Sequence, residues 1–331
     1  MNRRAAAAAD IGAAMALALL AAGCGKSEAP APIAAAKPAA TASVQDVSAE
    51  AVAKQARGDL SCPAKIASPV RADVAPVDDV LGVRPGLSYD EAVNAVLCTH
   101  ELLVASAATD RGFNLKVPDP RSVRQGFTAR FAEPRVTRTG RQIVQERTIE
   151  AMERGANAVR EDLKPGQVKW FVGTMGLPGR ERVLSVAREE RFAADQSPTI
   201  DTVVAALLKK YGTPTRDPRS TSGQLPVLRW AHDPLGRLVT EASPLQGKCN
   251  GASDPNGGVH LSPDCGVVVQ AMLVPQKSNP DLVERMQVGV VNQLGGYQAI
   301  TATEQSLGQL DQQRRADEVT KAAKNGKTPS L

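Results

Sequence analysis

Aromatic residues are scarce in this chain, which has 2 Trp, 3 Tyr and 5 Phe among its 331 residues. Proteins that stack bases or sugars on their surface need several exposed rings for that purpose, so the composition argues against nucleic acid as a partner. The charge balance points the same way. A total of 40 basic and 35 acidic residues leaves a formal net charge of only +5, which is too mild for this length to indicate a nucleic-acid surface.

Signatures of catalysis and of metal binding are also missing. The three histidines, His100, His232 and His260, are isolated in the sequence. No Cys-x-x-Cys or His-x-x-x-His pair occurs, although zinc ligands usually come in such close pairs. The stretch from Gly86 to Asp90 lacks the second glycine of a Gly-x-Ser-x-Gly nucleophile turn. We therefore expect a protein that is not an enzyme and that holds no metal and no cofactor.

Long apolar runs are missing after the first two dozen residues. A helix that spans a bilayer needs about 18 or more apolar residues, whereas the run from Ile11 to Ala22 has only 12. A short basic start, Asn2-Arg3-Arg4, precedes it. This order is typical of a secretory signal peptide, so we expect residues 1–23 to form a signal peptide. We expect that no later segment crosses a membrane.

The signal ends in Leu-Leu-Ala-Ala-Gly followed by Cys24, and this string resembles the lipobox of bacterial lipoprotein precursors. The resemblance implies cleavage before Cys24, a diacylglycerol on its sulfur and an acyl chain such as palmitate on its amine. Several acyl chains together anchor a protein stably to a membrane. Gly25 stands where lipoproteins retained at the inner membrane often carry aspartate. The resemblance therefore implies a lipid-anchored protein of the cell envelope, at the outer membrane and facing the periplasm.

The mature chain divides into three stretches by composition. Residues 24–55 hold the anchor and a segment rich in Ala, Pro and Ser without apolar periodicity, which indicates a disordered tether. Residues 56–300 mix hairpins with single helices, which favours an α+β fold with antiparallel sheet and a few packed helices. One domain, or two with a split near residue 165, is compatible with this pattern. Residues 301–331 read as a polar helix with a frayed tail.

Individual elements follow from periodicity and capping signals. Ser88 to Glu91 form a capping box that begins a helix, whose apolar positions continue to about Leu103. Further helices are expected at residues 140–160, 200–211 and 303–321. Strands are expected at residues 80–84, 123–131, 168–172, 182–192, 225–230, 267–274 and 286–291.

Four cysteines remain besides the one in the lipobox: Cys62, Cys98, Cys249 and Cys265. An even number in an oxidising compartment predicts two disulfides, for which three pairings are possible. Cys249 and Cys265 bracket a loop dense in Gly, Pro, Asn and Asp, which orders itself poorly. We expect a bridge there and a second one between Cys62 and Cys98. The alternative is a metal in this loop, either zinc with His260 or calcium.

Residues 121–160 contain nine arginines, four glutamates and no lysine, a net charge of +5. Arginine binds phosphate or carboxylate groups with a bidentate fork, so this segment predicts a contact face for anionic lipid or for an acidic envelope protein. The residues of the face would be Arg124, Arg130, Arg135, Arg138 and Arg141. The alternative is a solvated strand face followed by a helix with salt bridges on its surface.

The stretch from Gly86 to Ala92 resembles the turn and helix start of small outer-membrane-assembly lipoproteins of the SmpA/OmlA type. The resemblance implies helices packed on a small antiparallel sheet that binds envelope proteins. We expect a non-catalytic, lipid-anchored adaptor or assembly factor. The alternatives are a ligand-binding or sensor lipoprotein, which a closed apolar pocket would favour, and an envelope hydrolase, which a histidine gathered with an acid and a serine would favour. An arginine-rich or flat apolar surface would favour the adaptor.

Overall fold

The computed structural model describes residues 46–108, 113, 115–116, 122–154, 163–193, 195–215, 226–251, 253–254, 258–327 and 330. These ranges belong to the unit Val44–Leu331. The expected signal peptide, Cys24 and most of the expected tether lie outside the described residues. Within those ranges, no helix combines the length and the apolar character that crossing a membrane requires.

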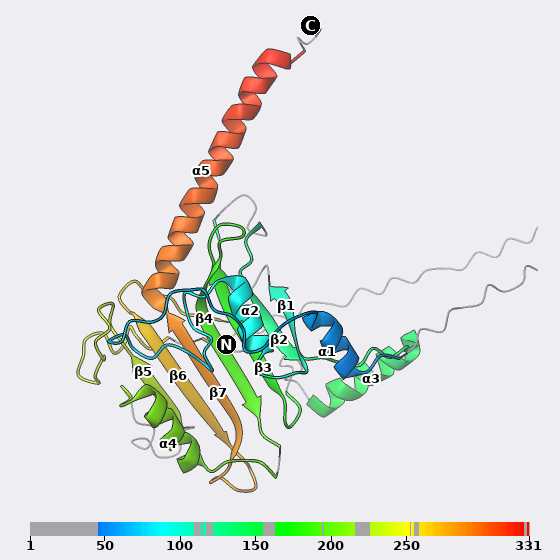
Figure 1. Cartoon of the computed structure of the whole chain (residues 1–331), viewed down its shortest axis with the longest axis vertical. Helices are drawn as coiled ribbons and strands as arrows, with labels where there is room; N and C mark the ends of the chain where they lie inside the picture. Colours follow the sequence, from blue (N-terminus) through cyan, green and yellow to red (C-terminus); the bar gives the residue numbers. More distant parts are fainter. Residues whose placement is uncertain are drawn as a thin grey trace, which may run out of the picture. The chain divides into compact units, whose positions relative to one another are not determined.

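Seven antiparallel strands form one sheet in the order β1-β2-β3-β4-β7-β6-β5 (Figure 1). Their bounds are β1 Leu103–Ala108, β2 Gly126–Phe131, β3 Val168–Met175, β4 Arg182–Arg191, β5 Val227–Ala231, β6 Val267–Pro275 and β7 Val283–Asn292. Strand β2 pairs with β3, so one sheet contains strands from both sides of residue 165, and β4 pairs with β7 near its centre. The α+β fold expected from the sequence is confirmed.

Five helices accompany the sheet in the part of the chain that the structure describes: α1 Ala49–Arg57, α2 Tyr89–Leu97, α3 Gly140–Arg154, α4 Ile200–Tyr211 and α5 Gln293–Asn325. Helices α2 and α4 pack on the same face, where Val96 and Leu207 join the main core with Trp170 and Trp230. Both indoles are almost fully buried, and Trp230 donates from Nε1 to the carbonyl of Gly212 at 2.9 Å. This face forms most of the hydrophobic core.

The two halves of the fold share a layout, a helix followed by an antiparallel meander, with four strands (β1–β4) in the first half and three (β5–β7) in the second; the last strands of the two halves, β4 and β7, are neighbours. The helix starts also match in sequence. Residues 88–97 and 199–208 align without gaps and share Asp, Val, Ala and Leu at four of ten positions. Ser88 and Thr199 cap their helices in the same way, each accepting from a backbone N–H three residues later. The chain therefore contains an internal helix–meander repeat joined along β4 and β7.

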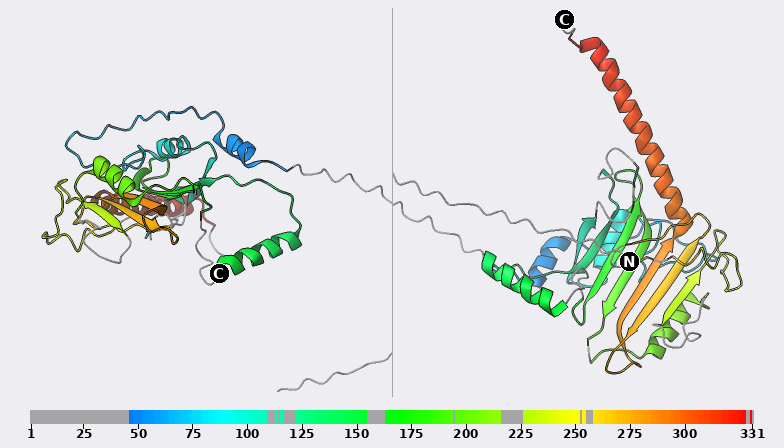
Figure 2. Two further views of the ribbon diagram at one scale, coloured as in Figure 1. Left: turned by 90° about the horizontal axis from the view of Figure 1, so that it is seen from below. Right: turned by 180° about the vertical axis from the view of Figure 1, so that it is seen from behind.

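The opposite face of the sheet is covered by a loop and by the beginning of α5. A Cβ added to Gly289 on β7 would overlap the carbonyl oxygen of Ser253, so the loop between Cys249 and Cys265 lies directly on that strand. Met175 and Leu184 pack with Ile300 of α5 in a second small core. Beyond these contacts, α5 extends away from the sheet (Figure 2).

Several element boundaries differ from the sequence-based expectation near α2. The helix ends at Leu97, because Thr99 turns its hydroxyl to the carbonyl of Val96 at 2.7 Å. Leu103 instead begins β1, a strand that the Ala-rich sequence did not predict. The expected strand at residues 80–84 is a tight turn with a single bridge between Val80 and Val83. Leu81 and Gly82 both have positive φ there, which interrupts extended pairing.

Other boundaries differ where capping or packing overrides the sequence pattern. Helix α1 begins at Ala49, inside the expected tether, because Ser48 caps it. Strand β2 begins at Gly126 instead of residue 123. Helix α5 begins ten residues earlier than expected, since Asn292 caps its first turn and Gly296 packs tightly on Leu261. The end of the helix expected at residues 140–160 lies partly outside the described residues.

Candidate functional site

Both expected disulfides are confirmed. Cys62 is bonded to Cys98 and Cys249 to Cys265, each with a Cα–Cα distance of 5.5 Å. These four sulfurs therefore form disulfides and are not metal ligands. His260 packs against Gly251 inside the bridged loop. In the ranges that the structure describes, no three His, Cys, Asp or Glu side chains lie close enough together to hold a metal ion.

Each histidine is held by local contacts on a different element. The His100 ring stacks on Phe131 with 4.4 Å between centroids, and its Nδ1 accepts from the backbone N–H of Leu102. His232 follows β5, and burial lowers the pKa of its imidazole despite the neighbouring Asp233. The Asp233 carboxylate accepts from the backbone of its own turn and pairs with the Arg237 guanidinium. These contacts position no imidazole for acid–base chemistry on a substrate.

Arg124, the first residue of the expected contact face, is a structural residue. Its guanidinium lies 2.9 Å from Glu181 Oε2, 3.3 Å from Asp90 Oδ1 and 4.1 Å from the centre of the Tyr89 ring. The Glu181 side chain is only 1% exposed. Burial alone would raise the pKa of Glu181, but hydrogen bonds from Arg124 and the backbone hold it below its usual range. Arg124 thus neutralises a buried carboxylate, while its own side chain remains 35% exposed and does not line the cleft described next.

Three other residues of the expected face, Arg130, Arg135 and Arg138, line one cleft of about 950 Å³. The cleft lies between the end of β2, the segment that follows it, the first residue of α1 and one side of α3. Six cationic and two acidic side chains line it, a balance of +4. They are Arg130, Arg135, Arg138, Arg147, Lys164, Lys169, Glu133 and Glu146. Apolar lining comes from residues such as Phe131, Ile143 and Leu163.

The charged side chains of the cleft differ in their exposure and in the ion pairs that they form. Arg138 pairs with Glu146 at 2.8 Å, but both side chains are nearly half exposed, so water screens the pair and it contributes little stability. Lys169 is buried on β3, with its Nζ 3.2 Å from Glu189 Oε2. Arg285 approaches the other oxygen of Glu189 at 3.1 Å. Two cations thus share one buried carboxylate, and of these three residues only Lys169 lines the cleft.

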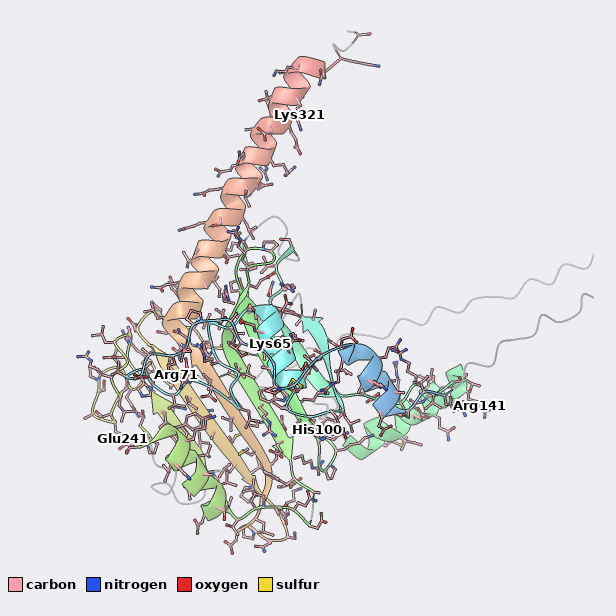
Figure 3. All side chains as sticks on the ribbon, in the orientation of Figure 1. Lys65, Arg71, His100, Arg141, Glu241 and Lys321 are labelled. Atoms are coloured by element: carbon pink, nitrogen blue, oxygen red, sulfur yellow. A yellow bond between two sulfur atoms is a disulfide. The ribbon has the colours of Figure 1, made fainter. Side chains whose placement is uncertain are left out.

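Arg141, the last residue of the expected face, lies on α3 but does not line the cleft. Figure 3 labels it near the end of α3 that is farther from the sheet. The structure thus divides the expected face into a buried ion pair at Arg124, a cleft with three arginines, and a separate position at Arg141.

Sequence reasoning missed three cations of the cleft: Arg147, Lys164 and Lys169. The lysines lie outside the arginine-rich segment and reach the cleft only because β3 pairs with β2. One signal was available for Lys169, which is the single charged residue in the otherwise uncharged strand β3. A charged side chain in such a strand usually has a partner.

Comparison with protein-family models, with curated proteins and with solved structures finds no match for this chain.

Proposed function

We propose that this chain is a non-catalytic, lipid-anchored protein of the bacterial cell envelope that acts as an adaptor or assembly factor. Its cationic cleft would receive an acidic segment of a partner protein. The observation that carries the proposal is the cleft itself, with six cationic and two acidic side chains around about 950 Å³. A surface of this kind favours an adaptor, whereas a ligand-binding lipoprotein would present a closed apolar pocket.

The proposed location rests on the N-terminal sequence. The string before Cys24 resembles a lipobox, and Gly25 favours transfer to the outer membrane with the folded part in the periplasm. Two disulfides support an oxidising compartment, because such bonds persist in the periplasm and are rare in the cytosol. The anchor and the cleft are thus separate parts of the proposal and need separate tests.

The chemistry of the cleft suits carboxylate groups. Arg135 and Arg147 are exposed and offer forked donors, which bind carboxylates in a bidentate way. A partner's carboxylate could also replace Glu146 beside Arg138, since that pair is half exposed and weak. Apolar side chains between the charges, such as Ile143, would contact the non-polar part of an acidic segment. An adaptor of this kind needs no nucleophile.

Lipidation is tested by replacing the anchor residue. The Cys24→Ser variant should fail to incorporate a palmitate analogue in bacteria and should leave the membrane fraction, whereas the wild-type chain should be labelled and sediment with membranes. Equal labelling of the two chains would rule out Cys24 as the lipidated residue.

The cleft is tested with a fluorescent oligoglutamate peptide and the mature chain carrying Cys24→Ser. Replacing Arg135, Arg138 and Arg147 with glutamine removes three charges from the cleft, and we expect about tenfold weaker binding at low salt. The fold should remain intact, since exposed charges usually change stability by under about 0.5 kcal/mol each.

A matched control removes three exposed cations elsewhere: Arg180, Lys277 and Lys321. This control has the same net charge as the cleft variant, so any difference between the two reflects the position of the charges. Affinity should be nearly unchanged in the control. Equal weakening in the two variants would mean that the peptide responds to net charge alone, and the cleft would no longer be a binding site.

A further inference from the structure

Helix α3 stands apart from the core. Every side chain described on it, from residue 140 to 149 and at Met152, is exposed, and Figure 2 shows the helix to one side of the sheet. A helix of 15 residues is marginal in water on its own, because most helical stability in proteins comes from packing one face on a partner. An external partner would supply the missing packing.

The two sides of α3 differ in chemistry. Ile143, Glu146 and Arg147 are three or four residues apart, so they share one side, and this side lines the cleft. Val144, Thr148 and Met152 follow at four-residue spacing on the other side, beside Arg141, Gln145 and Ile149. Met152 is 77% exposed, Val144 65% and Ile149 46%. We call these six residues, Arg141, Val144, Gln145, Thr148, Ile149 and Met152, the outer side of α3.

The chain arriving from the N-terminus joins the fold directly beside α3. Val47 and Arg135 exchange two backbone hydrogen bonds of 2.9 Å, and Asp46 accepts from the backbone N–H of Thr137 at 3.0 Å. Only 21 residues separate Cys24 from Asp46. A chain of that length reaches about 75 Å at most. With Cys24 lipidated, as in the proposed function, the start of α3 would stay within this reach of the membrane surface.

We infer that the outer side of α3 docks on the anionic phospholipid surface that holds the anchor. Interfacial helices insert a few apolar side chains at the level of the headgroups and place cations beside the phosphates. Here Val144, Ile149 and Met152 supply the apolar contacts. Arg141 interrupts them, but its long stem lets the guanidinium reach the headgroups while its methylenes pack below. The cleft on the opposite side of the helix stays open to a protein partner.

Charge favours lipid as the occupant. From residue 135 to the end of α3 at residue 154 the chain carries five arginines and three glutamates, a balance of +2, and Arg141 is the cation on the outer side. Juxtamembrane cations are attracted to anionic lipid, and the exposed Val144, Ile149 and Met152 add apolar burial to this attraction. A single weak membrane-binding element rarely gives stable membrane attachment. A lipid anchor and a docking helix on the same chain bind the membrane more stably together.

The test anchors the protein without using lipidation. The mature chain with Cys24→Ser carries an N-terminal hexahistidine tag and is bound to vesicles through a nickel-chelating lipid. Thr148→Cys is labelled with the fluorophore NBD under non-reducing conditions, which leave the two disulfides intact. On vesicles containing phosphatidylglycerol, we expect a blue shift and a rise of NBD emission, and quenching by spin-labelled lipid. On pure phosphatidylcholine, or at high salt, these changes should be much smaller.

Two pairs of substitutions distinguish docking by α3 from non-specific adsorption of the protein to vesicles. Val144→Asp with Met152→Asp places two charges on the outer side, and the blue shift should be lost. Val70→Asp with Leu235→Asp is the control, since these apolar side chains are also highly exposed, at 93% and 76%. Its signal should match that of the parent chain.

Each outcome decides the inference. A fluorophore that remains in water on anionic vesicles, or equal loss of signal in both pairs, overturns membrane docking by α3. This result is independent of fatty-acid labelling at Cys24 and of peptide binding in the cleft, so failure of the proposed function is recognised separately. Signal from phosphatidylcholine vesicles equal to that from anionic vesicles would also contradict the assigned lipid chemistry.

Discussion

Glu91 is the residue whose charge should matter most for stability. Its carboxylate accepts from the backbone N–H groups of Ala67 at 2.5 Å, Ser68 at 2.8 Å and Ser88 at 2.8 Å. The hydroxyls of Ser68 and Ser88 donate to the same group. Burial alone would raise the pKa of Glu91, but these hydrogen bonds lower it to about 2. One carboxylate thus joins the start of α2 to the segment around Ser68.

The magnitude follows from linkage between protonation and folding. Lowering the pKa of Glu91 from its ordinary 4.5 to about 2 corresponds to about 3 kcal/mol, at 1.36 kcal/mol for each pKa unit. Because the folded-state pKa is the lower one, this stability is fully present above pH 4.5 and is lost as the pH falls toward 2. Partial exposure of the side chain reduces the figure to about 2 kcal/mol.

Denaturant unfolding of the wild type and Glu91→Gln at pH 7 and pH 3 measures the effect. Glutamine cannot ionise, and its amide NH₂ would face one of the N–H or O–H groups that donate to Glu91 in the wild type. The variant should therefore be about 2 kcal/mol less stable at pH 7. The gap between the two proteins should narrow by about half at pH 3, because Glu91 is then almost fully protonated in the unfolded wild type but still mostly ionised in the folded one.

The difference in unfolding free energy between the wild type and Glu91→Gln isolates the contribution of Glu91, because the other carboxylates that titrate between pH 3 and pH 7 are present in both proteins. Glu241→Gln serves as a control, since this side chain is exposed, and it should show almost no gap at either pH. A deficit in Glu91→Gln that is equally large at pH 3 and pH 7 would show that the charge of Glu91 is not the source of its stability, and the reasoning above would be wrong.

Three further variants test the fold, and a fourth, Arg138→Gln, serves as a control. Replacing Cys249 and Cys265 with alanine should lower the free energy of unfolding by about 3 kcal/mol, since their bridge closes a loop of about 15 residues; peptide mapping without reductant should find the bridge in wild type. Gly289→Ala should cost more than about 2 kcal/mol in the same assay, because a Cβ there overlaps backbone. Arg124→Gln should cost about 2 kcal/mol by leaving a buried carboxylate unpaired, whereas Arg138→Gln should change stability by under about 0.5 kcal/mol.

Features set by short-range interactions were predictable from the sequence. The capping box at Ser88 forms as expected, and α4 has the expected bounds, Ile200 to Tyr211, since its cap, its apolar period and Gly212 agree. The disulfide at Cys249 was predictable because two cysteines bracket a loop that cannot order itself. In each case the decisive residues lie within one short stretch of chain.

Features that depend on distant pairing were not predictable. The segment from Leu103 to Ala108 has small residues that suit a helix as well as a strand, and only pairing with β2 makes it β1. Arg124 and Arg130 look alike in the sequence, yet the first meets a buried Glu181 and the second lines a cleft. Lys169 joins that cleft from another strand. The number of charges can be read from the sequence, but the buried acidic residues that pair with them cannot.

The internal repeat shows that the exposure of α3 is not a requirement of the fold. In one half, residues 132–167 connect β2 to β3 and contain α3; in the other, residues 232–266 connect β5 to β6. If the central strands β4 and β7 are matched, these connections occupy equivalent places and have nearly equal length. The second connection folds back onto the sheet, fixed by the buried disulfide between Cys249 and Cys265. The first presents Val144 and Met152 to solvent instead. Because the same scaffold can hold a connection of this size against the sheet, the exposed helix reflects its own sequence, and this supports a partner outside the chain.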